Sequence, residues 1–586
     1  MKVIGISGLE NSMAFKQARF PGLDEREYRI AQGMDAAAAL VIDGELVAAA
    51  EQERFSGKKH TGDFPIDAIR YVLAEGGVSL DEIDEIAHGF DYAPYRGLYT
   101  GDEVSAALYD QVFSKDVLLK QVQRDLPGFP LEKVHQVGHH LSHAASAAYT
   151  SGWDECLVVV NDAMGEVESM SIYDFHDGQL ERLRTVGAND SIGVLYSLVT
   201  LHLGFDFNSD EYKIMGLAPY GDPARFRSFF EQAVELCPDG SIRIPILKLN
   251  HTREERENYT ASRAYLDQHL IPRRNPDQSV SSIHEDVAAA LQECLERVVM
   301  HVSEHFGRET GLRNVALAGG VALNCTANGK LVRSGLFDEV YVQPVAGDDG
   351  VALGAALYRT ALRQPPPNHR FPAPLFGPQY AASDIVAALH RFDGQIQWKR
   401  HESREEACAH AAHLIAGGRV IAWHRGRMEY GPRALGNRSI LADPGHPEMR
   451  DRINAMVKKR EAFRPFAPAC TVEEAHRWFE VAPGAEFPYM ISIVQVRPEV
   501  RNLLPAITHV NGSARLQTVS TKDNPDFHAL LEAVGKTTGR QMVLNTSFNV
   551  KGQPIVNTPE EAIETFLGTG IEHLFLENFH VARATA

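Results

Sequence analysis

The chain of 586 residues is too long for one hydrophobic core, and its length suggests roughly two to four domains. With 44% hydrophobic and 23% charged residues, it has the composition of an ordinary globular protein. Its formal net charge of −19 disfavours general binding to nucleic acid or to anionic membranes, because the average field repels phosphate groups. Any phosphate that the protein binds must therefore meet a local basic pocket.

Cysteine usage and the apolar segments indicate a soluble, cytoplasmic protein. The six cysteines have no C-x-x-C spacing, which fits reduced thiols better than a disulfide framework or a zinc knuckle. No apolar run approaches the roughly 18 residues that span a bilayer, and residues 1–6 open directly as a strand without a signal peptide. We therefore expect no membrane partner and no nucleic-acid partner.

The first predicted strands surround an Asp-Gly turn. Residues 3–6 form a short apolar run that predicts a strand, and a polar stretch at about residues 10–32 follows it. Asp35 then opens a segment that continues to Ala50. This segment predicts two strands joined by a hairpin turn at Asp43-Gly44.

The stretch around residue 139 combines ligand chemistry with a predictable geometry. Residues 141–149 are rich in Ala and lack Gly and Pro, so they predict a helix, and His139 and His143 lie four residues apart at its start. Two neutral imidazoles on one helical face can bind one metal ion, whereas His140 points about 100° away. His135 lies in an alternating, strand-like segment, so we expect two ligands here and not three. A pair of capping or core histidines is the alternative.

The pattern of the first strands returns after residue 156. A strand runs into Asp162, and two further strands follow around a turn at Asp177-Gly178. Each copy pairs an acid at a junction of strand and loop, Asp35 or Asp162, with a hairpin closed by Asp-Gly. Two such halves predict a duplicated α/β domain with its cleft between the copies. The alternative is coincidence, since Asp-Gly hairpins are common.

Two further turns carry groups that could meet a ligand. Residues 314–318 run as a strand into Gly319-Gly320 and then into a helix, and such glycines let a ligand approach the backbone at a helix N-terminus. Residues 340–345 are the next predicted strand, and Asp348 and Asp349 precede a helix of small residues. One of these carboxylates could complete a metal site with the histidine pair. The alternatives are a tight turn without a ligand and Asp348 as a helix N-cap.

A proline-rich segment at residues 365–378 predicts a stiff linker. It separates a predicted first domain, residues 1–364, from a predicted second domain, residues 379–586.

The second domain has a local excess of positive charge. Residues 425–464 hold ten basic and five acidic residues, an excess of +5. In an acidic chain this suggests a pocket for a small phosphorylated substrate, because Arg offers bidentate donors and Lys a point charge. Part of the run, residues 449–459, has the pattern of a solvated helix. Residues 515–519 and 544–549 look like loops that could close the pocket, the second being a strand followed by amide and hydroxyl groups.

Six blocks of sequence, in order, resemble the NodU/CmcH family of O-carbamoyltransferases, especially natural-product enzymes of the tobramycin and geldanamycin type. The blocks are H-H-L-S-H-A-A-S-A at residues 139–147, E-Y-K-I-M-G-L-A-P-Y-G at 211–221, A-G-G-V-A-L-N-C at 318–325, Y-G-P-R-A-L-G-N-R-S at 430–439, K-K-R-E-A-F-R-P-F-A-P at 458–468 and L-N-T-S-F-N at 544–549. The resemblance covers nearly the whole chain.

This resemblance implies a fold and a two-site reaction. The first domain is expected to be a duplicated actin-like (ASKHA) domain akin to the tRNA threonylcarbamoyl-transferase subunit. The second is expected to be an α/β domain akin to threonylcarbamoyl-AMP synthase (YrdC-like). There carbamoyl phosphate and ATP would form carbamoyl-adenylate and pyrophosphate, and the intermediate would pass inside the protein to the first domain. A substrate hydroxyl would attack its carbonyl carbon there, and AMP would leave.

The resemblance also implies roles for individual residues. It makes His139, His143, Asp162 and Asp348 ligands of Fe(II) or another divalent metal, Gly193, Gly320 and Asn324 nucleotide contacts, Asn545 an ATP contact, and Arg433, Arg464, Arg515 and Ser547 the carbamoyl phosphate site, with Lys458 beside it. Arginines would neutralise phosphate oxygens, and the metal would act as a Lewis acid as AMP departs. An internal passage would shield the labile mixed anhydride from water.

One position departs from the pattern of the family. Related enzymes usually have His-Asp where this chain has Met34-Asp35, and that His is the proposed general base for the acceptor hydroxyl. A thioether cannot take a proton. Asp35 or His60 could serve instead, or the metal or the acceptor's own groups could activate the hydroxyl. The stretch at residues 10–32 either shapes the acceptor pocket or is a surface excursion.

Other functions compete with O-carbamoylation of a small-molecule hydroxyl. Transfer to tRNA is disfavoured by the net charge and by the lack of a basic stripe. A non-catalytic nucleotide-dependent module and a metal hydrolase are further alternatives. Aminoglycoside, macrolide, nucleoside, alkaloid and lipo-oligosaccharide hydroxyls all stay open as acceptors, and iron, zinc, manganese and cobalt all suit the ligand set. A homodimer is compatible with the sequence.

Overall fold

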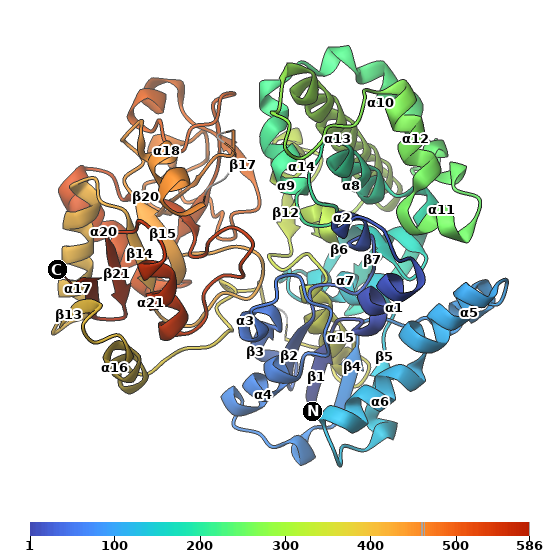
Figure 1. Cartoon of the computed structure of the whole chain (residues 1–586), viewed down its shortest axis with the longest axis horizontal. Coiled ribbons are helices and arrows are strands. Elements are labelled where there is room, and N and C mark those ends of the chain that lie inside the picture. Colours follow the sequence, from blue (N-terminus) through green and yellow to red (C-terminus); the bar gives the residue numbers. More distant parts are fainter. Residues whose placement is uncertain (368, 459–460, 462, 585–586) are drawn as a thin grey trace. The chain divides into compact units, whose positions relative to one another are not determined.

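The computed structural model describes residues 1–367, 369–458, 461 and 463–584, and the chain divides into two compact units (Figure 1). Unit 1 comprises Met1–Gln52 and His60–Phe371, and unit 2 comprises Glu53–Lys59 and Pro372–Ala586. The boundary between Phe371 and Pro372 falls inside the predicted proline-rich linker. The domain limits 1–364 and 379–586 stay predictions. No sequence pattern predicted that residues 53–59 belong with unit 2.

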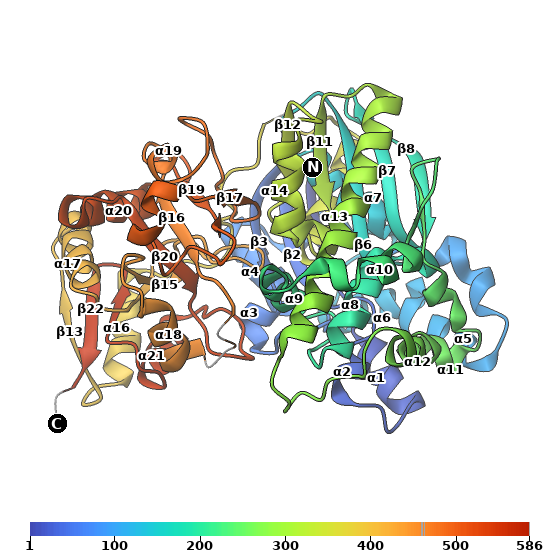
Figure 2. The same cartoon turned by 90° about the horizontal axis from the view of Figure 1, so that it is seen from above.

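Unit 1 contains two five-stranded mixed sheets of the same topology (Figure 2). The first sheet has the order β3-β2-β1-β4-β5, with β1 at Lys2–Ile6, β2 at Ala37–Ile42, β3 at Glu45–Glu51, β4 at Glu85–His88 and β5 at Val134–Gln136. The second has the order β8-β7-β6-β11-β12, with β6 at Glu155–Gly165, β7 at Glu168–His176, β8 at Gln179–Gly187, β11 at Asn314–Ala318 and β12 at Glu339–Val342. The central strands correspond: β1 runs antiparallel to β2 and parallel to β4, and β6 runs antiparallel to β7 and parallel to β11. The predicted duplication of an α/β domain is confirmed.

The predicted Asp-Gly hairpins are present in both sheets. Asp43 and Gly44 have φ angles of 53° and 92°, and Asp177 and Gly178 have 48° and 73°. Positive φ at both central residues matches the right-handed twist of the flanking strands. The predicted equivalence of the two acids is wrong, because Asp35 precedes the second strand of its sheet whereas Asp162 lies on the first strand of the other.

Two helices at corresponding positions of the halves pack against each other. Helix α7 (His139–Ala148) follows β5, and helix α15 (Asp349–Ala361) follows β12. A Cβ at Gly354 would lie 1.7 Å from the carbonyl oxygen of Ser142, so only glycine allows this approach of α15 to α7. The same holds at Gly5 of β1, where a Cβ would lie 1.7 Å from the carbonyl oxygen of Ala352. These contacts fix the starts of both helices relative to the sheets.

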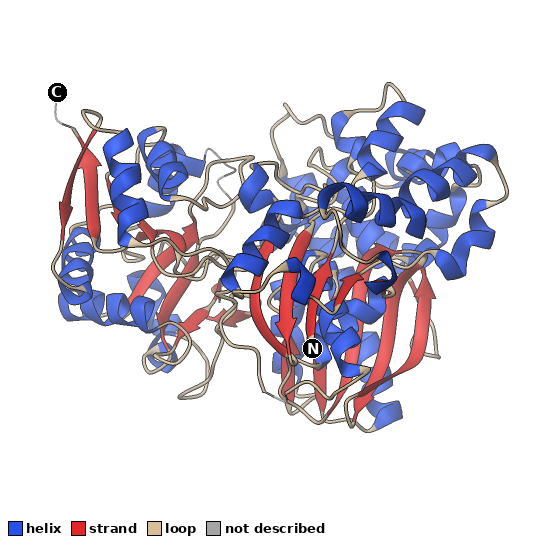
Figure 3. Ribbon diagram, turned by 90° about the horizontal axis from the view of Figure 1, so that it is seen from below, coloured by secondary structure: helices blue, strands red, loops and turns tan. Residues whose placement is uncertain are grey.

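The remaining α-helices of unit 1 cover the sheets and extend beyond them (Figure 3). They are α1 (Asn11–Arg19), α2 (Glu25–Tyr28), α4 (Ile66–Glu75), α5 (Glu103–Leu108), α6 (Lys115–Asp125), α8 (Ile192–His202), α9 (Glu211–Leu217), α10 (Arg227–Ala233), α11 (Arg253–Asn258), α12 (Thr260–His269), α13 (Ser282–Thr310) and α14 (Cys325–Ser334). The polar stretch at residues 10–32 is anchored, since the buried Lys16 ammonium donates to the carbonyl oxygens of Ile30 and Glu257. No helix of the described residues is long and apolar enough to cross a membrane.

Unit 2 is built on an eight-stranded sheet with the order β13-β22-β21-β14-β15-β20-β16-β19. Its strands are β13 (Ile396–Arg400), β14 (Ile421–His424), β15 (Arg438–Ala442), β16 (Ala467–Thr471), β19 (Gln517–Val519), β20 (Met542–Ser547), β21 (His573–Leu576) and β22 (Phe579–Arg583); β17 (Ile493–Gln495) pairs separately with β18 (Ser513–Arg515). Its α-helices are α3 (Glu53–Ser56), α16 (Ala382–Arg391), α17 (Arg404–Ala416), α18 (Met449–Ile453), α19 (Ala475–Trp478), α20 (Pro525–Thr538) and α21 (Pro559–Leu567). The YrdC-like assignment of this unit stays a prediction.

Two expectations for unit 2 need correction. Residues 515–519 do not form a loop, because Arg515 ends β18 and the next three-residue strand, β19, pairs with β16. The side chain of Leu516 between these strands is buried. The helix expected at residues 449–459 is interrupted: α18 ends at Ile453, and a π-helical turn, Asn454–Lys458, follows.

The segment Glu53–Lys59 binds to residues near β15 within unit 2. The guanidinium of Arg54 donates to the carbonyl oxygen of Gly431 at 2.9 Å, and the side-chain amide of Asn557 donates to the carbonyl oxygen of Arg54 at 3.2 Å. The Arg54 guanidinium also pairs with Glu53 at 2.8 Å. The segment is therefore part of the structure around residue 431.

Candidate functional site

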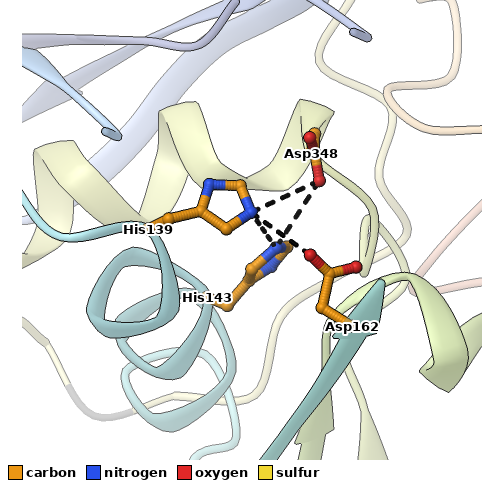
Figure 4. A group of neighbouring side chains, drawn as sticks. All are labelled: His139, His143, Asp162 and Asp348. Carbon is orange, nitrogen blue, oxygen red and sulfur yellow. Dashed lines mark hydrogen bonds and ion pairs between the residues drawn. The ribbon is translucent and has the colours of Figure 1, made fainter. Parts of the chain in front are cut away.

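Four side chains in unit 1 converge on one point (Figure 4). The Nε2 atom of His139 lies 3.1 Å from Nε2 of His143, 3.4 Å from a carboxylate oxygen of Asp162 and 3.5 Å from a carboxylate oxygen of Asp348. The Asp348 oxygen is also 3.8 Å from Nε2 of His143. The two histidines come from α7, Asp162 from β6 and Asp348 from the turn before α15. We call these four residues the cage.

Hydrogen bonds orient the imidazoles of the cage. Nδ1 of His139 lies 3.2 Å from the carbonyl oxygen of Gly89, so it carries the proton and donates, which leaves the Nε2 lone pair directed into the cage. The ring of Phe90 stacks on this imidazole with centroids 4.2 Å apart. His140 points elsewhere, as expected, with Nδ1 2.8 Å from the hydroxyl of Ser171. The Nε2 atoms of His139 and His143 are thus the groups available to a metal.

Asp162 lies where β6 departs from regular pairing. The register between β6 and β7 shifts between Asn161 and Gly165, so the expected junction of strand and loop is a bulge within the strand. One carboxylate oxygen of Asp162 accepts the backbone N–H of Gly320 at 3.0 Å, and the other faces His139. Gly193 lies against the same residue, since a Cβ there would come within 2.7 Å of the Asp162 carbonyl oxygen.

Asp348 does not act as a helix cap. It occupies the N-cap position of α15, yet its side chain accepts no capping hydrogen bond and faces the histidines. Capping is worth about 1 kcal/mol to a helix. The loss of that contribution supports a role for this carboxylate within the cage.

The electrostatics of the cage favour a bound cation. Burial lowers the pKa of His139, but the carboxylates of Asp348 and Asp162 overcome this and hold the pKa well above its usual range. Burial raises the pKa of Asp162, but the effect of His139 and His143 is larger and opposite, so the pKa lies far below its usual range. Burial, followed by the charges of Glu51 and Asp35, raises the pKa of Asp349 well above its usual value. Two imidazole nitrogens and two carboxylates around one buried point suit iron, zinc, manganese or cobalt.

Glu166 supports the cage from outside. Its two carboxylate oxygens accept the backbone N–H of His139 at 3.0 and 3.2 Å, and one of them accepts the backbone N–H of Asp91 at 2.7 Å. His139 is the first residue of α7, so this carboxylate satisfies a donor at the helix N-terminus. Burial raises the pKa of Glu166 to about 7. No sequence motif indicated this role of Glu166, although the residue directly follows β6, the strand that carries Asp162.

The expected nucleotide contacts lie around the turn after β11. Gly320 contacts Asp162, as described above, and begins a 3₁₀ turn, Gly320–Leu323, in place of the helix expected directly after the glycines. Asn324 then caps α14 by accepting the backbone N–H of Ala327 at 3.0 Å. The amide groups of Asn324 and Gln292 exchange two hydrogen bonds of 2.9 and 3.0 Å. Gly320 and Gly193 therefore border the cage through Asp162, and Asn324 lies one turn further along.

The expected carbamoyl phosphate residues come to one edge of the unit 2 sheet. Strand pairing sets Ser439 opposite Ser547, Ala467 opposite Asn545 and Ala469 opposite Gln517. The starts of β15, β16 and β19 thus meet the end of β20. Arg433, Arg464 and Arg515 precede those three starts by a few residues, and Ser547 ends β20; the side chain of Lys458 lies outside the described residues.

The turn that carries Arg433 is held by a buried carboxylate. One oxygen of Glu429 accepts the backbone N–H groups of Leu435 at 2.7 Å, Asn437 at 2.9 Å and Arg438 at 3.2 Å. The side-chain amide of Asn545 donates to the carbonyl oxygen of Ala434 at 3.1 Å, from the other side. Glu429 precedes the Y-G-P-R-A-L-G block, but its role depends on backbone geometry that the sequence does not reveal.

Asp35 is paired with His60 in unit 1. Nδ1 of His60 lies 2.8 Å from a carboxylate oxygen of Asp35. Both residues were expected as candidate bases, and the structure brings them together. Met34 is buried, and its sulfur lies 3.8 Å from the side-chain nitrogen of Asn208.

Known proteins match this chain along most of its length. The family model described as Carbamoyltransferase N-terminus matches residues 30–357, and the Carbamoyltransferase C-terminus model matches residues 412–583. Nodulation protein NolNO of Sinorhizobium fredii (strain NBRC 101917 / NGR234) is 41% identical over 557 residues, which cover 94% of this chain and 79% of that protein. The 3'-hydroxymethylcephem-O-carbamoyltransferase of Amycolatopsis lactamdurans is 29% identical over 561 residues, which cover 94% of this chain and 98% of that protein.

The solved structure of full-length HypF in the phosphate- and nucleotide-bound form is similar at a TM-score of 0.32 and 13% identity. It covers 62% of this chain and 56% of the HypF chain.

Proposed function

This chain belongs to the carbamoyltransferase family, and from that membership we propose that it is an ATP-dependent O-carbamoyltransferase with two reaction centres. Unit 2 makes carbamoyl-adenylate from carbamoyl phosphate and ATP, and unit 1 transfers the carbamoyl group to a hydroxyl of a small-molecule natural product. The observation that carries the proposal is the cage, whose four donors face one point next to the backbone of Gly320.

The first step takes place at the edge of the unit 2 sheet. Water hydrolyses carbamoyl phosphate to carbamate and inorganic phosphate. An oxygen of the carbamate then attacks the α-phosphorus of ATP, which releases pyrophosphate. Arg433, Arg464 and Arg515 bind the phosphate oxygens and neutralise their charge, because guanidinium groups match phosphate geometry. Ser547 donates to the same group, and the buried Asn545 orients the turn of Arg433 beside ATP.

The second step takes place at the cage. His139, His143, Asp162 and Asp348 would hold Fe(II) or another divalent metal. When bound, the metal supplies Lewis-acid stabilisation of the charge that develops on the departing adenylate phosphate. Gly193 and Gly320, which lie against Asp162, contact the nucleotide beside the cage, and Asn324 contacts it from the start of α14.

The names of two relatives support the proposed acceptor. One relative is named for O-carbamoylation of a hydroxymethyl group on a cephem. Another is named for nodulation. We propose a hydroxyl of a natural product as the acceptor for this chain.

Two variants test the division into two steps. Arg433→Ala should abolish carbamoyl-phosphate-dependent release of pyrophosphate from ATP. His143→Ala should leave that release largely intact and stop the gain of one carbamoyl group by a hydroxylated acceptor, measured by mass spectrometry. His140→Asn is the matched control for the second variant, because His140 lies on the same helix but faces Ser171. Loss of the same step in both variants would contradict the two-site proposal.

A further inference from the structure

The His60–Asp35 pair has the arrangement of a base and the group that orients it. Nδ1 of His60 is 2.8 Å from a carboxylate oxygen of Asp35, so Nδ1 carries the proton and Nε2 presents its lone pair. The hydroxyl oxygen of Ser209 lies 3.4 Å from Nε2, so a hydroxyl group can approach that lone pair. The side chains of His60 and Asp35 are 20% and 37% exposed, so a small molecule can reach them.

The backbone holds the two residues in an unusual conformation. Asp35 and His60 have φ angles of 58° and 56°, in the left-handed region that few residues other than glycine adopt. The backbone N–H of Ala36 donates to the carbonyl oxygen of Thr61 at 2.9 Å, so the two left-handed residues stay side by side. A Cβ at Gly62 would lie 2.5 Å from the carbonyl oxygen of Gly33, so the two turns are in close contact. The pair is therefore fixed before any substrate binds.

Close contacts within unit 1 connect the pair to the cage. A Cβ at Gly8 would lie 2.7 Å from Cβ of Ala36 and 3.1 Å from the carbonyl oxygen of Gly62, so Gly8 lies against both turns that carry the pair. The carbonyl oxygen of Gly8 lies 2.9 Å from Nε2 of His88, and the carbonyl oxygen of the next residue, Gly89, lies 3.2 Å from Nδ1 of His139 in the cage. Met34 beside Asp35 offers only a thioether, which accepts no proton.

We propose that His60 is the general base that takes the proton of the acceptor hydroxyl, and that Asp35 is a positioning residue that holds the imidazole for this task. This inference rests on the proposed function and assigns the proton transfer within it. The acceptor oxygen forms a bond to the carbonyl carbon of carbamoyl-adenylate, and the bond from that carbon to the phosphate oxygen of AMP breaks. The electron pair leaves with AMP, and the acceptor proton moves to Nε2 of His60. Asp35 stabilises the resulting imidazolium.

The test compares two nucleophiles in the full-length enzyme. The first is the alcohol that gains a carbamoyl group fastest with wild type, chosen from a panel of aminoglycoside, nucleoside and hydroxymethylcephem compounds. The second is hydroxylamine, whose neutral nitrogen attacks without prior loss of a proton. Carbamoyl-phosphate-dependent pyrophosphate release in unit 2 reports whether the enzyme is intact. His251→Asn, at an exposed position of unit 1, is the control variant.

His60→Asn should lower transfer to the alcohol by about 100-fold or more, the usual contribution of a general base, and leave transfer to hydroxylamine close to wild type. Asp35→Asn should lower transfer to the alcohol in kcat more than in KM, again with hydroxylamine spared. Wild-type transfer to the alcohol in His60→Asn, or an equal loss with both nucleophiles, would overturn the proposal. If wild-type enzyme carbamoylates no member of the panel and releases no pyrophosphate, the proposed function fails instead.

Discussion

The carboxylate of Glu166 accepts the backbone N–H of His139 at 3.0 Å, so a residue outside the cage holds the first turn of the helix that supplies two of its donors. The same carboxylate accepts the backbone N–H of Asp91 at 2.7 Å. One buried side chain thus ties α7 to the segment that follows β4. Its removal should disturb both the helix and the cage.

Glu166→Gln should weaken metal binding. The amide has one acceptor oxygen and turns a donor toward one of the N–H groups, so at least one buried hydrogen bond is lost, at a cost of about 1–3 kcal/mol in the free energy of unfolding. Metal affinity should fall by roughly 10–100-fold, as for other residues that support metal ligands. Competition with a fluorescent chelator measures this. Glu181→Gln, at an exposed position on β8, should change neither quantity, and an unchanged affinity in Glu166→Gln would refute the supporting role.

Gly165→Ala should displace the ring of His139. A Cβ at residue 165 would lie 2.2 Å from Cδ2 of His139, which is far inside van der Waals contact. We expect loss of metal binding measured by isothermal titration, together with a lower melting temperature. Gly97→Ala is the matched control, because nothing lies within 4 Å of a Cβ there. Normal metal binding by Gly165→Ala would mean that the cage tolerates movement of this histidine.

Divalent metal should stabilise unit 1. A ligand that binds only the folded state at 100 times its Kd adds about 2.7 kcal/mol to the free energy of unfolding. Fe(II), Mn(II), Co(II) and Zn(II) should therefore be tested for an increase in melting temperature, under anaerobic conditions for iron. Asp348→Asn should remove the increase and His135→Asn should not, since His135 lies on β5 outside the cage. An equal increase in both variants would place the metal elsewhere.

Glu429→Ala should disrupt the turn of Arg433, whereas Glu429→Gln should preserve it. Alanine leaves three backbone N–H groups without their acceptor, and each unpaired buried donor costs about 1–3 kcal/mol. The glutamine amide keeps one acceptor oxygen at the same position. We expect a higher KM for carbamoyl phosphate in the alanine variant, measured by pyrophosphate release, and little change in Glu499→Ala at an exposed position. Equal KM values in all variants would show that the turn does not set substrate affinity.

A cluster of four histidines in unit 2, His401, His410, His573 and His580, should make the protein sensitive to acid. Burial, followed by the neighbouring His410, His573 and His401, lowers the pKa of His580 from its ordinary 6.5 to about 3. Nδ1 of His573 lies 3.0 Å from Nε2 of His580, and Lys399 adds a further positive charge. Between these pKa values the unfolded chain binds more protons than the folded one, so stability falls as pH decreases from about 6.5 toward 3.

Melting temperatures measured between pH 8 and pH 5 test this dependence. His580→Asn should show a shallower decrease on acidification than wild type, even if its absolute stability is lower. His390→Asn, at an exposed position on α16, should keep the wild-type slope. Parallel curves for wild type and His580→Asn would exclude His580 as a source of the acid sensitivity.

Local patterns predicted the duplicated sheets and the placement of His139 and His143 on one face of a helix. The Asp-Gly turns and the four-residue spacing of His139 and His143 depend on short-range backbone geometry, which the sequence encodes directly. The position of Asp348 and Asp349 before a helix suggested that one of them could join the histidines, whereas Asp162 as a further ligand came from the resemblance, because it is far from the others in the chain. The metal itself and the roles of the arginines stay predictions.

Other features depend on contacts that no local pattern contains. Residues 517–519 form a strand because β19 pairs with β16, whose partner residues lie 48 positions earlier (Ala469 opposite Gln517), and tertiary pairing outweighs a mixed local pattern. Glu166 and Glu429 act on backbone N–H groups whose positions are set by the fold. The helix at residues 449–459 ends early at a π-helical turn, which its apolar spacing did not indicate.

The path of the chain has a practical consequence for dividing this enzyme. The polypeptide changes units between residues 52 and 53, between 59 and 60, and again between 371 and 372. A protein truncated at residue 371 or begun at 372 would separate Arg54 from the Gly431 carbonyl that it binds. Co-expressed fragments would therefore have to supply residues 53–59 to the second fragment as a peptide or a graft, and a gene fusion that moved residues 372–586 alone would carry an incomplete unit 2.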